Sequence, residues 1–157
     1  MAWSNSKIFS AFVTDVMNNT TAMDLNADTF MAVLYDNDIT PDQTVASANT
    51  AYNAGQWTAS GNEVADGTEW DAGGEPLTSV TSTFASNVYT FDAANTQSGG
   101  TSATLANVFG CLVYDTTIAT PVADQGVCYN YFGGTNSVTD GTFTIVWHTS
   151  GIFSLTL

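Results

Sequence analysis

Few residues of this chain carry side chains that catalyse reactions. It has one histidine, His148, and two cysteines, Cys111 and Cys128. Nucleophilic catalysis needs a base within hydrogen-bond reach of a serine or cysteine, and His148 lies near a predicted turn on a solvent-facing side. One histidine and two isolated cysteines also do not make a typical zinc site. We therefore predict no catalytic residues, no enzymatic activity and no cofactor.

The two cysteines lie within predicted strands, and their spacing is not that of a metal site. Free buried cysteines behave as small hydrophobic side chains, which is the interpretation we prefer. A disulfide between adjacent strands is the alternative, so cysteine usage leaves the redox compartment open.

Carboxylates are the remaining reactive groups, and two acidic clusters lie in loops. The clusters are Asp36-Asn37-Asp38 with Thr40 and Asp42, and Asp66 with Glu69 and Asp71. The first resembles the start of a calcium loop but lacks the glycine and glutamate that complete one. Such clusters usually form solvated turns, so we predict no metal, with bound calcium as the alternative. Counting alone also leaves open a carboxylate pair for glycoside hydrolysis.

Composition limits the possible partners. The 157 residues include fifteen Asp and Glu against one Lys, Lys7, and no Arg, for a net charge of −14. A nucleic-acid-binding protein needs cations to neutralise phosphates, and an anionic membrane surface attracts cations in the same way. Nucleic acid and membrane are therefore excluded as partners. Only 10% of residues are charged, so Thr, Ser, Asn, Gln and Gly must form a surface that suits protein contacts.

The pattern of apolar residues predicts a mainly β fold: an antiparallel β-sandwich or partly open barrel with one N-terminal α-helix. Residues 1–157 form a single predicted domain, with an N-terminal arm and helix over about residues 1–19. The helix is expected over Ser6–Asn18, where apolar residues recur at helical spacing. The expected strands are Asp28–Asp36, Leu77–Val80, Asn87–Asp92, Ala106–Asp115 and Gly126–Phe132.

The C-terminal stretch Gly141–Leu157 alternates in a way that predicts a β-hairpin. A three-residue loop, Thr149-Ser150-Gly151, would place Trp147 opposite Phe153. Gly151 would supply the positive φ that such a loop requires.

The segment Gln56–Pro76 is rich in Gly and acidic residues and is expected to be a long ordered loop. Trp57, Val64 and Trp70 are predicted to anchor it to the protein body. In the alternative, Trp57, Trp70 or Tyr52 stacks on sugars, which would make the chain a carbohydrate-binding β-module.

Four segments of the chain, in this order, resemble small structural proteins of tailed bacteriophages that infect actinobacteria. The segments are Leu25–Tyr35, Asn62–Gly74 with its Trp70, Gly110–Asp115 and Asn136–Trp147. The individual patterns are strand-and-turn signals of modest specificity, so the resemblance depends on their order along most of the chain.

The resemblance implies a non-enzymatic virion protein, a capsid decoration or minor capsid protein on the outside of the shell. A minor tail or fibre protein is the alternative. The implied partners are the major capsid protein (or tail proteins) and further copies of the chain, with a trimer favoured. The implied localisation is the virion, after synthesis in the host cytoplasm. We expect the interaction surface to include Ala2, Trp3, Trp57 and Trp70.

Overall fold

The structure, a computed structural model, describes residues 3–157. Three antiparallel sheets and an N-terminal helix make up the fold, and the sheets do not close into a barrel. Strand residues account for 37% of the chain and helical residues for 10%, which confirms the prediction of a mainly β protein. Within the described residues, no helix is both long and apolar enough to cross a membrane.

The largest sheet has five strands in the order β1-β8-β7-β2-β3. Its strands are β1 (Lys7–Ile8), β8 (Gly126–Gly141), β7 (Ala103–Asp115), β2 (Phe30–Tyr35) and β3 (Glu75–Pro76). Strand β2 lies between β7 and β3, and five of its six residues are buried. Its side chains are therefore covered on both faces of the sheet, as its continuous run of apolar residues predicts.

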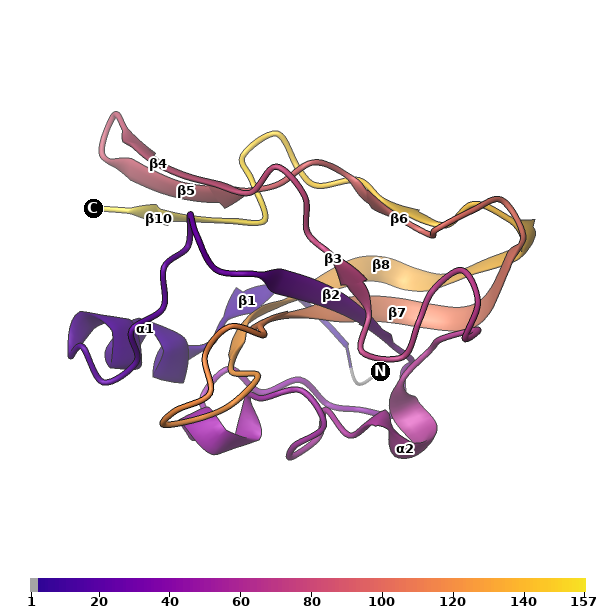
Figure 1. Cartoon of the computed structure of the whole chain (residues 1–157), viewed down its shortest axis with the longest axis horizontal. Coiled ribbons are helices and arrows are strands. Elements are labelled where there is room, and N and C mark those ends of the chain that lie inside the picture. The colour runs from indigo at the N-terminus through magenta and orange to yellow at the C-terminus, as the bar shows by residue number, and fades with distance from the viewer. Residues whose placement is uncertain (1–2) are drawn as a thin grey trace.

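Two smaller sheets and the helix pack around the large sheet (Figure 1). The three-stranded sheet has the order β10 (Phe153–Thr156), β5 (Val88–Asp92), β4 (Thr81–Ala85), and β6 (Thr96–Gln97) pairs with β9 (Thr144–Ile145). The helical elements are α1 (Ser10–Met17), the 3-10 turn Ser47–Asn49, and α2 (Ala59–Asn62), one irregular turn. The ring of Phe91 in β5 lies 5.2 Å from that of Phe30 in β2 and joins the two sheets.

Trp57 lies at the centre of an aromatic cluster that joins distant parts of the chain. Its ring centroid is 5.2–5.9 Å from those of Trp3, Phe9, Tyr35 and Tyr129. The Tyr35 hydroxyl donates to the Trp57 carbonyl at 2.6 Å. The cluster therefore holds the N-terminal arm, β2, β8 and the long loop together.

The predicted helix start at Ser6 is wrong, because Lys7 and Ile8 pair with β8 instead. The Phe9 N–H extends this pairing by donating to the Val127 carbonyl at 3.1 Å. The helix begins only at Ser10 and has no side-chain cap at its N-terminus. The edge of β8 offers backbone partners to this segment, so pairing with it prevails over the local helical pattern.

The predicted C-terminal hairpin is also wrong, although its turn forms. Gly151 has φ +88° and its N–H donates to the His148 carbonyl at 2.8 Å. The two arms then separate: β9 pairs with β6, and β10 pairs with β5. In β10, Phe153 lies opposite Phe91 of β5. The three-stranded sheet thus gives Phe153 an apolar partner as suitable as Trp147, the partner expected from the local pattern.

The strand expected over Leu77–Val80 does not form. Strand β3 ends at Pro76 and β4 begins at Thr81, and between them Ser79 has φ +51°. This left-handed conformation interrupts an extended strand. The remaining expected strands are present, with β8 extended to Gly141.

Asp115 ends β7 with a carboxylate that is fully buried. Its Oδ1 accepts N–H groups from Thr117 at 2.6 Å and Ile118 at 3.2 Å. Burial raises the pKa of Asp115 from 3.8 to about 6, and the nearby Asp28 carboxyl contributes to the rise. The folded chain thus binds a proton on Asp115 at a pH where the unfolded chain does not.

This raised pKa predicts that Asp115 makes the fold less stable as pH rises from about 4 to about 6, because the folded state must then ionise a buried group. We expect Asp115→Asn to raise the free energy of unfolding by about 1–2 kcal/mol near neutral pH, and by much less near pH 4. Urea unfolding at several pH values measures both effects.

The matched control is Asp140→Asn, which removes the same charge from an exposed position whose positive φ asparagine tolerates. Equal stability changes in the two variants would contradict a specific effect of Asp115 and would point to net charge alone.

Candidate functional site

The tryptophans expected at an interaction surface are buried. Trp3, Trp57 and Trp70 each have 0% of their surface exposed, so their rings do not face a partner. Trp57 and Trp70 instead anchor the long loop, and the partly buried Val64 packs against the core, as predicted. Ala2 lies outside the described residues.

The residues expected to stack on sugars likewise pack against other side chains of the chain. Trp57 and Trp70 are buried, and Tyr52 stacks on Tyr114 with 5.0 Å between ring centroids. The Tyr52 hydroxyl lies 3.0 Å from a Glu63 carboxylate oxygen, to which it donates. Trp57 and Trp70 therefore have no exposed ring on which a sugar could stack, and Tyr52 is half-buried with its ring stacked on Tyr114.

His148 is exposed, as predicted, and its Nδ1 accepts the Ser150 N–H at 3.1 Å. Cys111 and Cys128 are both free and buried, which confirms the preferred interpretation. Burial raises the pKa of the Cys128 thiol to about 12 and that of Cys111 well above its ordinary value. Neither thiol is ionised near neutral pH, so neither is available as a nucleophile.

Carboxylates of the two acidic clusters bind backbone N–H groups. Asp36 Oδ1 accepts the Asp38 N–H at 2.9 Å, and Asp42 Oδ1 accepts the N–H and hydroxyl of Thr44. These contacts close Asx turns. Over residues 3–157, no three His, Cys, Asp or Glu side chains are grouped so that they could hold a metal ion.

Asp66 is the centre of the second cluster. Its Oδ1 accepts N–H groups of Glu69 and Trp70 at 2.8 and 2.9 Å, and its Oδ2 accepts that of Thr104 at 3.0 Å. These hydrogen bonds hold the pKa of Asp66 well below its usual range, and the bond from the Trp70 N–H has the largest effect. Asp66 thus fixes the long loop against the start of β7.

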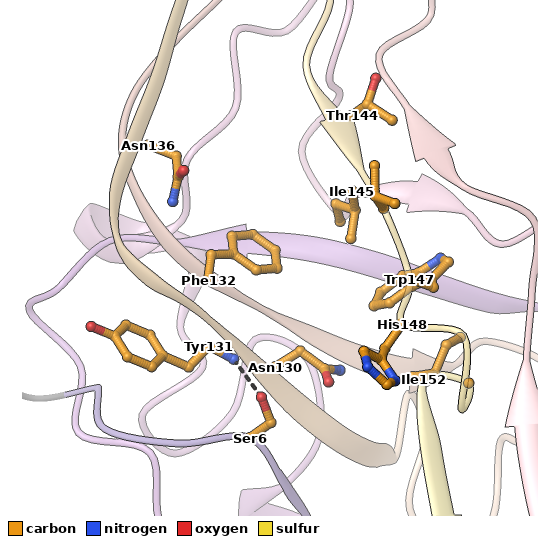
Figure 2. A pocket seen from close by; sticks show the side chains of 12 residues that line it. Ser6, Asn130, Tyr131, Phe132, Asn136, Thr144, Ile145, Trp147, His148 and Ile152 are labelled. Atoms are coloured by element: carbon orange, nitrogen blue, oxygen red, sulfur yellow. Dashed lines mark hydrogen bonds between the residues drawn. The ribbon is translucent and has the colours of Figure 1, made fainter.

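Among the surface hollows of the described residues, we consider two as candidate binding sites, neither of which was predicted from the sequence. The first, which we call the β8–β9 groove, has a volume of about 530 Å³ and lies between β8 and residues 144–152 (Figure 2). It is lined by Ser6, Asn130, Tyr131, Phe132, Asn136, Thr144, Ile145, Val146, Trp147, His148, Gly151 and Ile152.

Figure 2 shows how the two walls of the β8–β9 groove face each other. Asn130 and Phe132 project from the same face of β8, while Trp147, His148 and Ile152 form the opposite wall. Alternation along β8 explains the first wall, since residues two apart share a face. The turn at Gly151 shapes the second wall, and this turn was predicted from the sequence.

The second hollow, which we call the helix groove, is apolar and has a volume of about 400 Å³. It lies between α1 and the three-stranded sheet. It is lined by Phe12, Val13, Val16, Met17, Leu25, Phe84, Tyr89, Phe153, Leu155 and Leu157. None of these side chains is charged, and Met17, Phe84 and Leu157 are 81%, 59% and 83% exposed. The sequence predicted the apolar stripe of the helix but not that part of it stays uncovered.

Comparisons of the chain with protein-family models, curated proteins and solved structures found no match. The resemblance to phage virion proteins therefore depends on the residues quoted for it above.

The buried thiols give a prediction for thiol chemistry. We expect a disulfide-forming reagent such as Ellman's reagent to leave Cys111 and Cys128 unmodified in the native chain near pH 8, because both are buried and protonated. In concentrated guanidinium chloride, both should react. Rapid labelling of the native chain would contradict this burial. No labelling after unfolding without reductant would indicate a disulfide.

Proposed function

We propose that this chain is a non-enzymatic structural protein of a tailed-phage virion, a decoration protein that binds the outside of the capsid shell and stabilises it. The observation that carries the proposal is the helix groove, whose exposed apolar side chains are suited to a protein partner. The assignment to a virion is supported by the four segments that resemble phage structural proteins and by their order along the chain.

The helix groove is suited to docking because it exposes large apolar side chains together. Met17, Phe84 and Leu157 all project from its rim. Contiguous apolar surface of this kind on a soluble protein commonly marks a protein contact. Covering Met17 and Phe84 contributes about 1 kcal/mol or more each, by the usual value of apolar burial.

Charge favours a partner other than a second copy at this groove. Each copy carries a net charge of −14, with Lys7 as its single cationic side chain, so two copies repel each other over distances set by salt. A less acidic shell protein avoids this repulsion, and its apolar segment fits a groove without charged side chains. We therefore assign the helix groove to the shell. The same repulsion acts on every contact between copies, so the expected trimer must bury enough of its other surfaces to overcome it.

The states of the reactive side chains support a non-enzymatic role. His148 is exposed, and its Nδ1 is engaged by the turn. The two thiols are buried and protonated. Asp66, the carboxylate with the most backbone contacts, holds a loop in place.

The proposal is tested by immunogold labelling of purified virions with an antibody against this chain. Gold over the heads would support a decoration protein. Gold confined to the tail would favour the alternative of a minor tail or fibre protein. Virions without gold would overturn both assignments. Light scattering of the isolated chain tests the expected trimer separately.

The helix groove gives a sharper prediction. We expect the double variant Met17→Gln/Phe84→Thr to bind capsid shells roughly thirtyfold more weakly, because about 2 kcal/mol of apolar burial is lost. Neither substitution changes the charge, and Gln and Thr suit a helix and a strand. Cosedimentation with shells that lack this protein measures the binding.

The matched control is Val146→Thr, which removes apolar character from a residue that is 71% exposed and lies outside the helix groove. Equal binding by the double variant and the unaltered chain would rule out the groove as the shell contact. A double variant that instead lost its oligomeric state would assign the groove to the contact between copies.

A further inference from the structure

We propose that the β8–β9 groove binds an uncharged oligosaccharide. This site goes beyond the decoration role and does not depend on it. It also differs from the sugar site considered from the sequence, because Trp57, Trp70 and Tyr52 lie outside it.

The aromatic side chains of the groove supply stacking surfaces. Phe132 and Trp147 are half-buried and lie on opposite walls (Figure 2). The Trp147 Nε1 donates to Thr96 Oγ1 at 3.2 Å, which fixes the indole. The C–H faces of a pyranose ring are apolar and weakly positive, so they pack well against the negative face of an aromatic ring.

The polar groups of the groove complement sugar hydroxyls. Asn136 Nδ2 donates to the carbonyls of Val108 and Gly134 at 3.3 and 3.0 Å, which fixes the amide and leaves Oδ1 as an acceptor. Ser6 Oγ accepts the Tyr131 N–H at 3.0 Å, so its hydroxyl proton can be donated to a ligand.

His148 adds a further donor. Its Nδ1 accepts the Ser150 N–H, so the neutral imidazole carries its proton on Nε2. The ring is exposed and lines the groove. Fixed donors and acceptors beside aromatic surfaces are the usual composition of a ligand site, and the groove volume is within the usual range.

Charge and length define the class of sugar. None of the residues that line the β8–β9 groove is an acid, a lysine or an arginine, and the net charge of −14 repels anionic sugars. A further hollow of about 320 Å³ shares Ser6, Asn130 and Ile152 with the groove and continues along β1, where Lys7 is its one charged lining residue. The continuous surface is suited to several sugar units in a row.

An extended peptide pairing with the edge of β8 is a different kind of occupant. It would need the outward backbone groups of β8, but the Tyr131 N–H already donates to Ser6. The mixture of half-buried rings and fixed amides favours a sugar over a peptide strand.

Tryptophan fluorescence reports on this site directly. Of the four tryptophans, Trp3, Trp57 and Trp70 are fully buried, and Trp147 alone is partly exposed. We would titrate the full chain with neutral hexasaccharides of glucose, mannose, galactose and N-acetylglucosamine, with an oligogalacturonate as the acidic probe. At least one neutral hexasaccharide should change the fluorescence and protect Trp147 from acrylamide quenching.

Calorimetric titration of variants with the hexasaccharide that binds then locates the site. Trp147→Ala should weaken binding about tenfold or more through lost stacking. His148→Ala removes an exposed donor, is expected to leave the fold intact, and should weaken binding severalfold. The control Phe84→Ala removes an exposed ring of the helix groove, outside the β8–β9 groove, and should leave the affinity for the hexasaccharide unchanged. No binding by any neutral hexasaccharide, preference for the acidic probe, or equal binding by both groove variants and the unaltered chain would overturn the proposal.

Discussion

The contacts around Trp57 hold together parts of the chain that no local rule connects. Its ring touches Trp3 and Phe9 from the N-terminal arm, Tyr35 from β2 and Tyr129 from β8. Aromatic contacts of this kind contribute beyond the area they bury. Three edge-to-face contacts, from Trp3, Phe9 and Tyr35, and one tilted contact, from Tyr129, converge here on one indole. Because the arm is fixed there, β1 can pair with β8, α1 begins only at Ser10, and the helix lies beside the three-stranded sheet. Both surface hollows depend on this placement.

A chain with a single cationic side chain cannot rely on ion pairs, and its carboxylates take a different role. Asp66 and Asp42 accept backbone N–H groups in turns, and Asp115 does so from a fully buried position. Hydrogen bonds from N–H groups stabilise the ionised form, whereas burial favours the neutral form. Asp66 and Asp115 differ in this balance: backbone bonds prevail at Asp66, and burial prevails at Asp115. These carboxylates thus hold loops through hydrogen bonds to backbone N–H groups.

The C-terminal segment contributes to both candidate sites. Before and at the turn, Trp147, His148 and Gly151 line the β8–β9 groove; after it, Phe153 and Leu155 line the helix groove. The first hollow combines rings with fixed amides and suits a neutral polar ligand, while the second is wholly apolar and suits a protein segment. Had the two arms paired as a hairpin, neither wall would stand where it does. The placement of β9 and β10 in different sheets therefore creates two surfaces of different chemistry.

The sequence by itself determined the mainly β character, the buried strand β2, the anchoring role of Trp57 and Trp70, the turn at Gly151 and the exposure of His148, because each depends on local alternation, residue volume or turn chemistry. The tertiary structure alone decided which strands pair. Phe153 has suitable apolar partners both in Trp147 nearby and in Phe91 far away, and periodicity does not rank them. It likewise decided that Lys7 and Ile8 extend along β8 rather than start a helix. The two grooves belong to this second group, since their walls come from segments distant in sequence and their exposed rings carry no local pattern that distinguishes them from the core.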